Sequence, residues 1–146
     1  AGLGLLPART VFAPEKTLAR PVGEALGETV HGYEIHHGVV EVLDTAPPGT
    51  EPFLDGCRLG SVWGTTWHGA LENDSFRRAF LRRVAADAGR AFVPAPGTRF
   101  TELREKQLDR LGDLIEEHMD TAALLRLIEQ GIPDGLPFIP PGAPQP

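Results

Sequence analysis

The hydrophobic pattern of the chain changes its period near residue 73. Upstream, β-branched and aromatic residues gather in short runs between glycines and prolines, which predicts strands over 10–13, 29–43 and 59–68. Downstream, apolar residues recur at helical spacing, which predicts helices over 75–88, 101–118 and 122–130. Taken alone, strands followed by helices indicate a small α+β domain. Taken as part of a longer protein, this order fits the second half of an α/β domain whose parallel strands lie upstream.

Capping and turn-forming residues mark the ends of these segments. Suitable helix N-caps and stops are Asn73 or Asp74, Gly89, Thr101, Asp120 or Thr121, and Gly131. Residues 52–60 are predicted to connect two strands. Residues 132–146 are too rich in proline and glycine to form a regular element. We therefore expect part of one domain over 1–131 and a Pro/Gly-rich tail over 132–146.

Composition and charge exclude several classes of function. The chain is 41% apolar and carries a net charge of -6, so it has core-forming residues but no excess of basic groups to neutralise phosphates. We expect no nucleic-acid partner. No run approaches the roughly 18 apolar residues of a membrane span, and a single cysteine excludes an internal disulfide. We expect no membrane partner and a cytoplasmic location. The apolar start AGLGLLP lacks an initiator Met, which predicts a chain that continues upstream.

Four of the five histidines, His31, His36, His37 and His68, fall within 38 residues. Three interpretations are open. As metal ligands they lack companion cysteines, and His36 and His37 would point to opposite faces of a strand, so we expect no metal site. As structural residues, each would be a half-buried side chain beside an aromatic neighbour. As catalytic residues, His68 is the informative one.

His68 stands where a catalytic base is expected. It ends a predicted strand and Gly69 opens the following loop, and reactive groups in α/β folds gather at the carboxyl ends of strands. A histidine there can act as a general base near neutral pH. Cys57 is a poor partner for it, because LDGCRLG is a polar connection without a helix start or elbow to activate a thiol. We interpret Cys57 as an inert loop thiol and expect Cys57→Ser to leave catalysis nearly unchanged.

Several strings of the sequence together resemble the cobyric acid synthase family. They are GLGLLP at 2–7, FAPEKTLARPVG at 12–23, HGYEIHHG at 31–38, VWGTTWHGALEND at 62–74, FRRAFL at 76–81 and LDRLGDLIEEHMD at 108–120. They follow one another in order over almost the whole chain. The sister family that amidates cobyrinic acid at the a and c positions is the alternative.

The resemblance implies the C-terminal portion of a class I, Cys–His glutamine amidotransferase domain with a flavodoxin-like α/β fold. In that family a cysteine on a strand-to-helix elbow attacks glutamine, and a histidine moves the protons. GTTWHG matches the catalytic-histidine motif, so the resemblance assigns that role to His68. YEIHHG matches a second motif near the site, so Tyr33, Glu34 and His36 are expected to line the substrate site. No string matches the elbow, so the isolated chain is expected to be inactive.

One position departs from the wider amidotransferase class. Many members carry a Glu two residues after the histidine, where it orients the ring, and here that position is Ala70. Glu34, Glu72 or a backbone carbonyl is left to orient His68. Glu34 is slightly favoured, because ENDSF has the composition of a solvated helix entry.

The activity implied by the resemblance is a glutamine-hydrolysing, ATP-dependent amidation of corrin side-chain carboxylates in cobalamin biosynthesis, from adenosylcobyrinic a,c-diamide to cobyric acid. Glutamine would bind at the His68 site. ATP, Mg²⁺ and the corrinoid would bind an N-terminal synthetase domain, so no cofactor is expected in this chain. The alternatives are a cobyrinate a,c-diamide synthase-like amidotransferase, or a non-catalytic binding or assembly fragment if the chain is not part of a longer protein.

Overall fold

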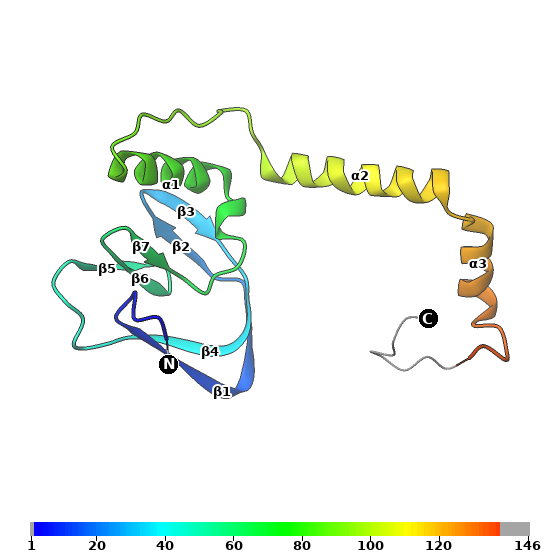
Figure 1. The fold of residues 1–146 in the computed structure, drawn as a ribbon, viewed down its shortest axis with the longest axis horizontal. Helices are drawn as coiled ribbons and strands as arrows, with labels where there is room; N and C mark the ends of the chain where they lie inside the picture. The colour runs from blue at the N-terminus through cyan, green and yellow to red at the C-terminus, as the bar shows by residue number, and fades with distance from the viewer. Residues whose placement is uncertain (1, 138–146) are drawn as a thin grey trace. The chain divides into compact units, whose positions relative to one another are not determined.

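The structure, a computed structural model, describes residues 2–137. The chain divides into two units, Ala1–Thr101 and Glu102–Pro146 (Figure 1). The first unit contains all the strands found in the described residues and the helices that follow them directly. Of the predicted tail, residues 132–137 form no helix or strand, and residues 138–146 lie outside the described part of the chain.

The strands of the first unit form small antiparallel groups. The long pair is β1 (Ala8–Ala19) with β4 (Glu34–Val42), and a hairpin joins β2 (Val22–Ala25) to β3 (Glu28–His31). Leu26 and Gly27 form the hairpin turn with positive φ angles of 56° and 76°, the backbone of a two-residue turn that matches strand twist. A third group orders β5 (Thr50–Phe53), β6 (Gly56–Leu59) and β7 (Val62–Gly64).

Two helices complete the first unit. The short 3-10 helix η1 (Ala70–Glu72) leads into α1 (Asp74–Asp87), which lies over β2 and β3 (Figure 1) and contacts β3. Gly89, with a φ angle of 64°, follows the last turn and ends the helix, as predicted. The linker after it is held back to α1, because the Phe100 N–H donates to Asp74 Oδ1 at 2.9 Å and Arg77 donates to the Thr98 carbonyl at 3.3 Å.

The core of the first unit is small and aromatic. Val30, Phe53, Ala70 and Phe76 are buried, and the side chains packed against them are Ala25, Leu26, Leu54, Trp63, Trp67 and Phe80. Ring centroids lie 5.0 Å apart for Phe53 and Trp63 and 6.0 Å apart for Phe76 and Phe80, distances at which aromatic pairs stabilise beyond their area. The core therefore joins the hairpins to α1 and to the turn that precedes it.

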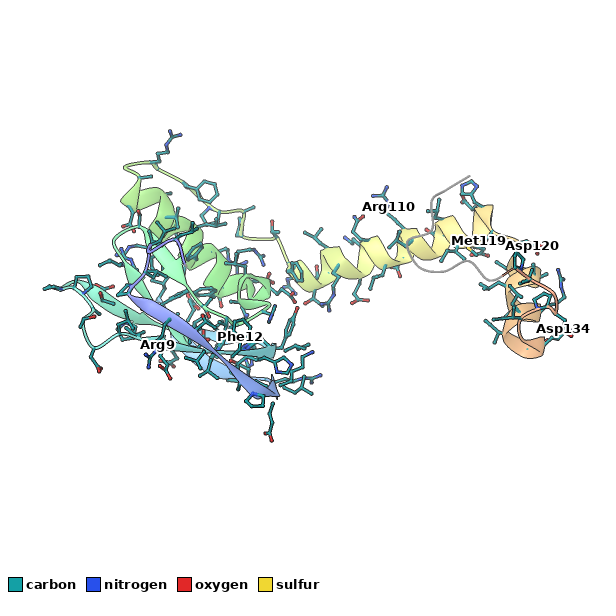
Figure 2. The ribbon with its side chains drawn as sticks, turned by 60° about the horizontal axis from the view of Figure 1, so that its bottom comes forward. Arg9, Phe12, Arg110, Met119, Asp120 and Asp134 are labelled. Atoms are coloured by element: carbon teal, nitrogen blue, oxygen red, sulfur yellow. The ribbon has the colours of Figure 1, made fainter. Side chains whose placement is uncertain are left out.

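The second unit is helical. It contains α3 (Thr121–Gln130) and most of α2 (Phe100–His118), which Met119 and Asp120 separate (Figure 2). Asp120 caps α3, because its carboxylate accepts from the Ala123 N–H at 2.9 Å, and Gly131 ends the helix; both were predicted. The predicted apolar stripe of α2 is present but about half exposed: Leu108, Leu111, Leu114 and Ile115.

The observed strands and the start of α2 differ from the sequence predictions at several places. The strand expected over 29–43 is two strands, because the backbone breaks at Gly32 and Tyr33, where a Cβ on Gly32 would lie 3.0 Å from the Cβ of Trp67. The connection expected over 52–60 is a hairpin that includes β6, so Cys57 is a buried strand residue and not a loop thiol. Thr101 does not cap α2, which begins at Phe100.

The strand expected over 59–68 is also shorter. β7 ends at Gly64, because Thr65 and Thr66 donate hydrogen bonds to Asp55 in the turn of the β5–β6 hairpin. The parallel strands expected for the domain are not among the described residues, in which every strand pair is antiparallel. The observed chain thus has strands first and helices second, in a mixed arrangement.

Candidate functional site

His68 is fixed by its backbone to the break between β3 and β4. The N–H of Tyr33 donates to the His68 carbonyl at 3.0 Å, and the N–H of His68 donates to the Tyr33 carbonyl at 2.9 Å. The two rings stack, with centroids 5.1 Å apart and planes inclined by 14°. The His68 side chain remains exposed. Its ring is therefore oriented on one face by Tyr33 and open to a ligand elsewhere.

His36 is the second histidine of the site. Its ring centroid lies 6.3 Å from that of His68. Glu34 stands beside His36, with its Oε1 3.4 Å from His36 Nε2. Both ring nitrogens of His36 are buried and form no hydrogen bond with the described residues, so this contact is not a hydrogen bond. It is an ion pair only if the ring carries a proton on both nitrogens. Glu34, the favoured partner for His68 in the sequence, thus contacts His36 instead.

A pocket opens in front of the two rings. It has a volume of about 420 Å³, and its lining is Thr10, Phe12, His36, His37, Gly38, Thr65, Thr66, Trp67 and His68. Phe12 contributes to this lining from β1; the residue is labelled in Figure 2. The lining combines apolar rings with hydroxyl and imidazole groups, which suits a small polar ligand. Tyr33, Glu34 and His36 were predicted to line the substrate site; of these, His36 lines this pocket, whereas Tyr33 stacks on His68 and Glu34 contacts His36.

Of the other two histidines of the cluster, His37 also lines the pocket and His31 does not. His31 ends β3, and His37 points its Nδ1 toward the Ala13 carbonyl at 3.2 Å, which is a contact with β1. Among residues 2–137, no group of three or more His, Cys, Asp or Glu side chains is placed to hold a metal ion. The alternation of faces expected for His36 and His37 is observed.

Asp55 anchors the segment that leads to His68. Its carboxylate accepts from Thr65 Oγ1 at 2.5 Å, from the Thr66 N–H at 3.0 Å and from the Thr66 hydroxyl. Burial raises the pKa of Asp55, but the bonds from Thr65 and Thr66 together outweigh it and leave the pKa below its ordinary value of 3.8. Because the pKa of Asp55 is lower in the folded protein, its hydrogen bonds contribute fully to the free energy of unfolding at pH values above 3.8. This contribution is lost as the pH falls through the folded-state pKa.

Asn73 anchors the segment that follows His68. Its Oδ1 accepts from the His31 N–H at 3.0 Å, and its Nδ2 donates to the carbonyls of His31 at 2.8 Å and Ala70 at 3.0 Å. The side chain therefore pairs with the end of β3 like a further strand residue. Asn73 is the residue before α1, as predicted, but its side chain makes no cap bond to the helix. Sequence reasoning missed this role, since ENDSF carries no signal for a distant backbone partner.

We expect Asn73→Asp to lower the free energy of unfolding by about 2–3 kcal/mol, because a carboxylate would face the His31 and Ala70 carbonyls without a donor. Thermal unfolding of the purified protein measures the effect. Asp44→Asn is the matched control, the reverse swap between the same two residue types at an exposed position. Equal stability of Asn73→Asp and the unchanged protein would show that this amide is not a structural clamp.

Cys57 lies away from the His68 pocket. It is buried in β6 and lines a different pocket of about 320 Å³, beside Pro52 and Gly56. Cys57 is not among the residues that line the pocket in front of His68. Among the residues described, no helix is long and apolar enough to cross a membrane.

The comparisons with known proteins identify the family of the chain. The CobB/CobQ-like glutamine amidotransferase domain matches residues 1–76, which include Tyr33, His36 and His68. The chain is 74% identical to the cobyric acid synthase of Streptomyces avermitilis over 143 residues, 98% of this chain and 28% of that protein. It is 72% identical to the cobyric acid synthase of Streptomyces coelicolor over 143 residues, again 98% of this chain and 28% of that protein.

A more distant relative agrees. The cobyric acid synthase of Mycobacterium tuberculosis is 50% identical over 143 residues, 98% of this chain and 27% of that protein. The chain thus spans little more than a quarter of the length of these curated relatives. No solved structure matches it. The resemblance inferred from the motifs is confirmed: the chain belongs to the CobB/CobQ-like glutamine amidotransferase domain family and is similar over almost its whole length to cobyric acid synthases.

Proposed function

We propose that this chain is part of a longer amide synthase, called the full-length protein below, and supplies the histidine of its glutamine-hydrolysing site. The reaction would use ATP to amidate corrin side-chain carboxylates in cobalamin biosynthesis, taking adenosylcobyrinic a,c-diamide to cobyric acid. The observation that carries the proposal is the similarity to cobyric acid synthases over 98% of the chain. The exposed His68 ring at a pocket of polar and aromatic groups supports it.

His68 has two tasks in this proposal. It removes the proton from a cysteine thiol, and the thiolate attacks the side-chain carbonyl carbon of glutamine. His68 then gives that proton to the departing nitrogen as the carbon–nitrogen bond breaks, which releases ammonia and leaves a thioester. In the second half, His68 takes a proton from water as it attacks the thioester and returns one to the sulfur, which yields glutamate. The thiol would come from a cysteine outside this chain.

The surroundings of His68 suit these tasks. The Tyr33 ring stacks on one face of the His68 ring. The two backbone hydrogen bonds between Tyr33 and His68 fix the position of the His68 backbone, from which the ring extends. With Ala70 in place of the usual Glu, this stacking is the principal restraint on the ring that the described residues provide. His36 lines the glutamine pocket, and the Glu34 carboxylate contacts the His36 ring.

ATP, Mg²⁺ and the corrinoid belong elsewhere in this proposal. The lining of the His68 pocket contains no carboxylate, the ligand that Mg²⁺ favours, so the residues there do not fit the ion. We therefore place ATP and Mg²⁺ on an N-terminal synthetase domain of the full-length protein. We also propose that the parallel strands of a flavodoxin-like fold and the elbow cysteine belong to a part of the full-length protein outside this chain, as the family resemblance implies.

Transfer of labelled nitrogen tests the proposed function. The full-length protein is incubated with ATP, Mg²⁺, adenosylcobyrinic a,c-diamide and glutamine labelled with ¹⁵N at its amide, and mass spectrometry follows the corrinoid. The proposal expects ¹⁵N in new side-chain amides and glutamate as co-product. Amidation of cobyrinic acid in preference to the a,c-diamide would favour the cobyrinate a,c-diamide synthase alternative. No transfer with either substrate would favour a non-catalytic role.

A further inference from the structure

The segment between β7 and His68 has no regular structure of its own. Residues 65–67 follow the end of β7 at Gly64, and in the described chain they are held mainly by one side chain, Asp55 of the β5–β6 turn. Leu54, the residue before Asp55 in this turn, has a positive φ of 51°, a backbone conformation that non-glycine residues adopt rarely. The turn is therefore shaped so that the Asp55 carboxylate meets this segment.

The Asp55 carboxylate uses both oxygens. Oδ1 accepts from Thr65 Oγ1 at 2.5 Å and from the Thr66 N–H at 3.0 Å, and Oδ2 accepts from the Thr66 hydroxyl. Thr65 passes the constraint on, because its Oγ1 accepts from the Trp67 N–H at 3.1 Å. One acidic group thus sets the backbone of three consecutive residues, up to the residue before His68.

Trp67 continues the chain of contacts. Its side chain packs closely on two glycines: a Cβ on Gly23 would lie 2.9 Å from Trp67 Cη2, and one on Gly32 would lie 3.0 Å from Trp67 Cβ and 3.1 Å from Trp67 Cε3. Next to Gly32, Tyr33 forms the backbone pair with His68. A shift of residues 65–67 would therefore push the Trp67 side chain into Gly23 or Gly32, which it already contacts closely. The same shift would displace His68 from its backbone hydrogen bonds with Tyr33.

We propose that Asp55 is a positioning residue for His68: it holds the Thr65–Thr66–Trp67 segment in the one path that presents the imidazole to the glutamine pocket. This inference rests on the proposed function, in which His68 is the general base. Asp55 does not line the His68 pocket, so it acts through the segment and touches no substrate. A displacement of about 1 Å in a catalytic group costs on the order of 100-fold in rate.

The test compares Asp55→Asn with His68→Ala and with the double variant, all in the full-length protein. We expect Asp55→Asn to lower kcat for glutamine hydrolysis by about 100-fold, with free-ammonia amidation unchanged. In the His68→Ala background, Asp55→Asn should cause no further loss, because a residue that acts only through His68 has nothing left to position. Glu51→Gln is the matched control, an acidic residue of the same hairpin that is exposed.

A second variant keeps the proposal testable if Asp55→Asn does not fold. Asp55→Glu keeps a carboxylate but moves it by one methylene, so it should lower kcat for glutamine hydrolysis by less than about 100-fold, again with free-ammonia amidation unchanged. Full glutaminase activity in Asp55→Asn, or an equal further loss in the His68→Ala background, would overturn the positioning role. Full activity in His68→Ala itself would instead overturn the proposed function.

Discussion

His68→Ala is expected to remove glutamine-dependent amidation in the full-length protein while amidation with free ammonia continues. The loss should be about 10²–10⁴-fold in kcat, the contribution of a positioned general base. The physical reason is that a neutral thiol is a weak nucleophile and the departing nitrogen needs a proton. Ammonia added to the solution bypasses both needs. The ring itself is exposed, so its removal should leave the fold intact.

Initial rates with glutamine and with ammonium chloride, each under saturating ATP, measure this difference. His118→Ala is the matched control, because His118 is an exposed histidine at the end of α2. It should leave both rates unchanged. Loss of both activities in His68→Ala would mean that His68 is structural, and retention of both would remove it from the mechanism.

Phe76→Ala is expected to have the largest effect on stability, a loss of about 3–5 kcal/mol in the free energy of unfolding. Phe76 is 1% exposed and lies on α1. Its ring packs on Phe53 of β5, with centroids 6.2 Å apart, and on Phe80 of the same helix, so it joins α1 to the hairpins. Truncation would leave a cavity lined by aromatic rings. Because the buried core has few members, little can relax into that cavity.

Urea denaturation followed by tryptophan fluorescence measures the effect, since Trp63 contacts the same core. Phe92→Ala is the matched control: Phe92 is 49% exposed, and its truncation should change the unfolding free energy by less than about 0.5 kcal/mol. Similar losses for the two variants would show that the core is not centred on Phe76.

The helices were predictable from sequence because their signals are local. Periodic apolar residues, the Asp120 cap and the stops at Gly89 and Gly131 lie within each helix or beside it. The strands were harder, because short β segments carry little periodicity. The β5–β6 hairpin was missed because Pro52 and Gly56 suggested an irregular connection, whereas both residues lie in paired strands.

The candidate site was predictable only in part, since its contacts join distant parts of the chain. The motifs selected Tyr33, Glu34, His36 and His68, but no local pattern predicts that Tyr33 stacks on His68 while Glu34 contacts His36. Asp55 was also missed. A turn-forming Asp-Gly pair upstream of two adjacent threonines was the available signal, and it becomes meaningful only when the hairpin is known.

The central claim is that His68 serves a cysteine that is not Cys57. Its most direct test is covalent trapping of the full-length protein with a chloroketone analogue of glutamine, followed by peptide mass spectrometry. We predict one adduct on a cysteine outside residues 1–146, formed about 100-fold more slowly in His68→Ala and at an unchanged rate in Cys57→Ser. An adduct on Cys57, or trapping that proceeds equally fast without His68, would contradict the claim.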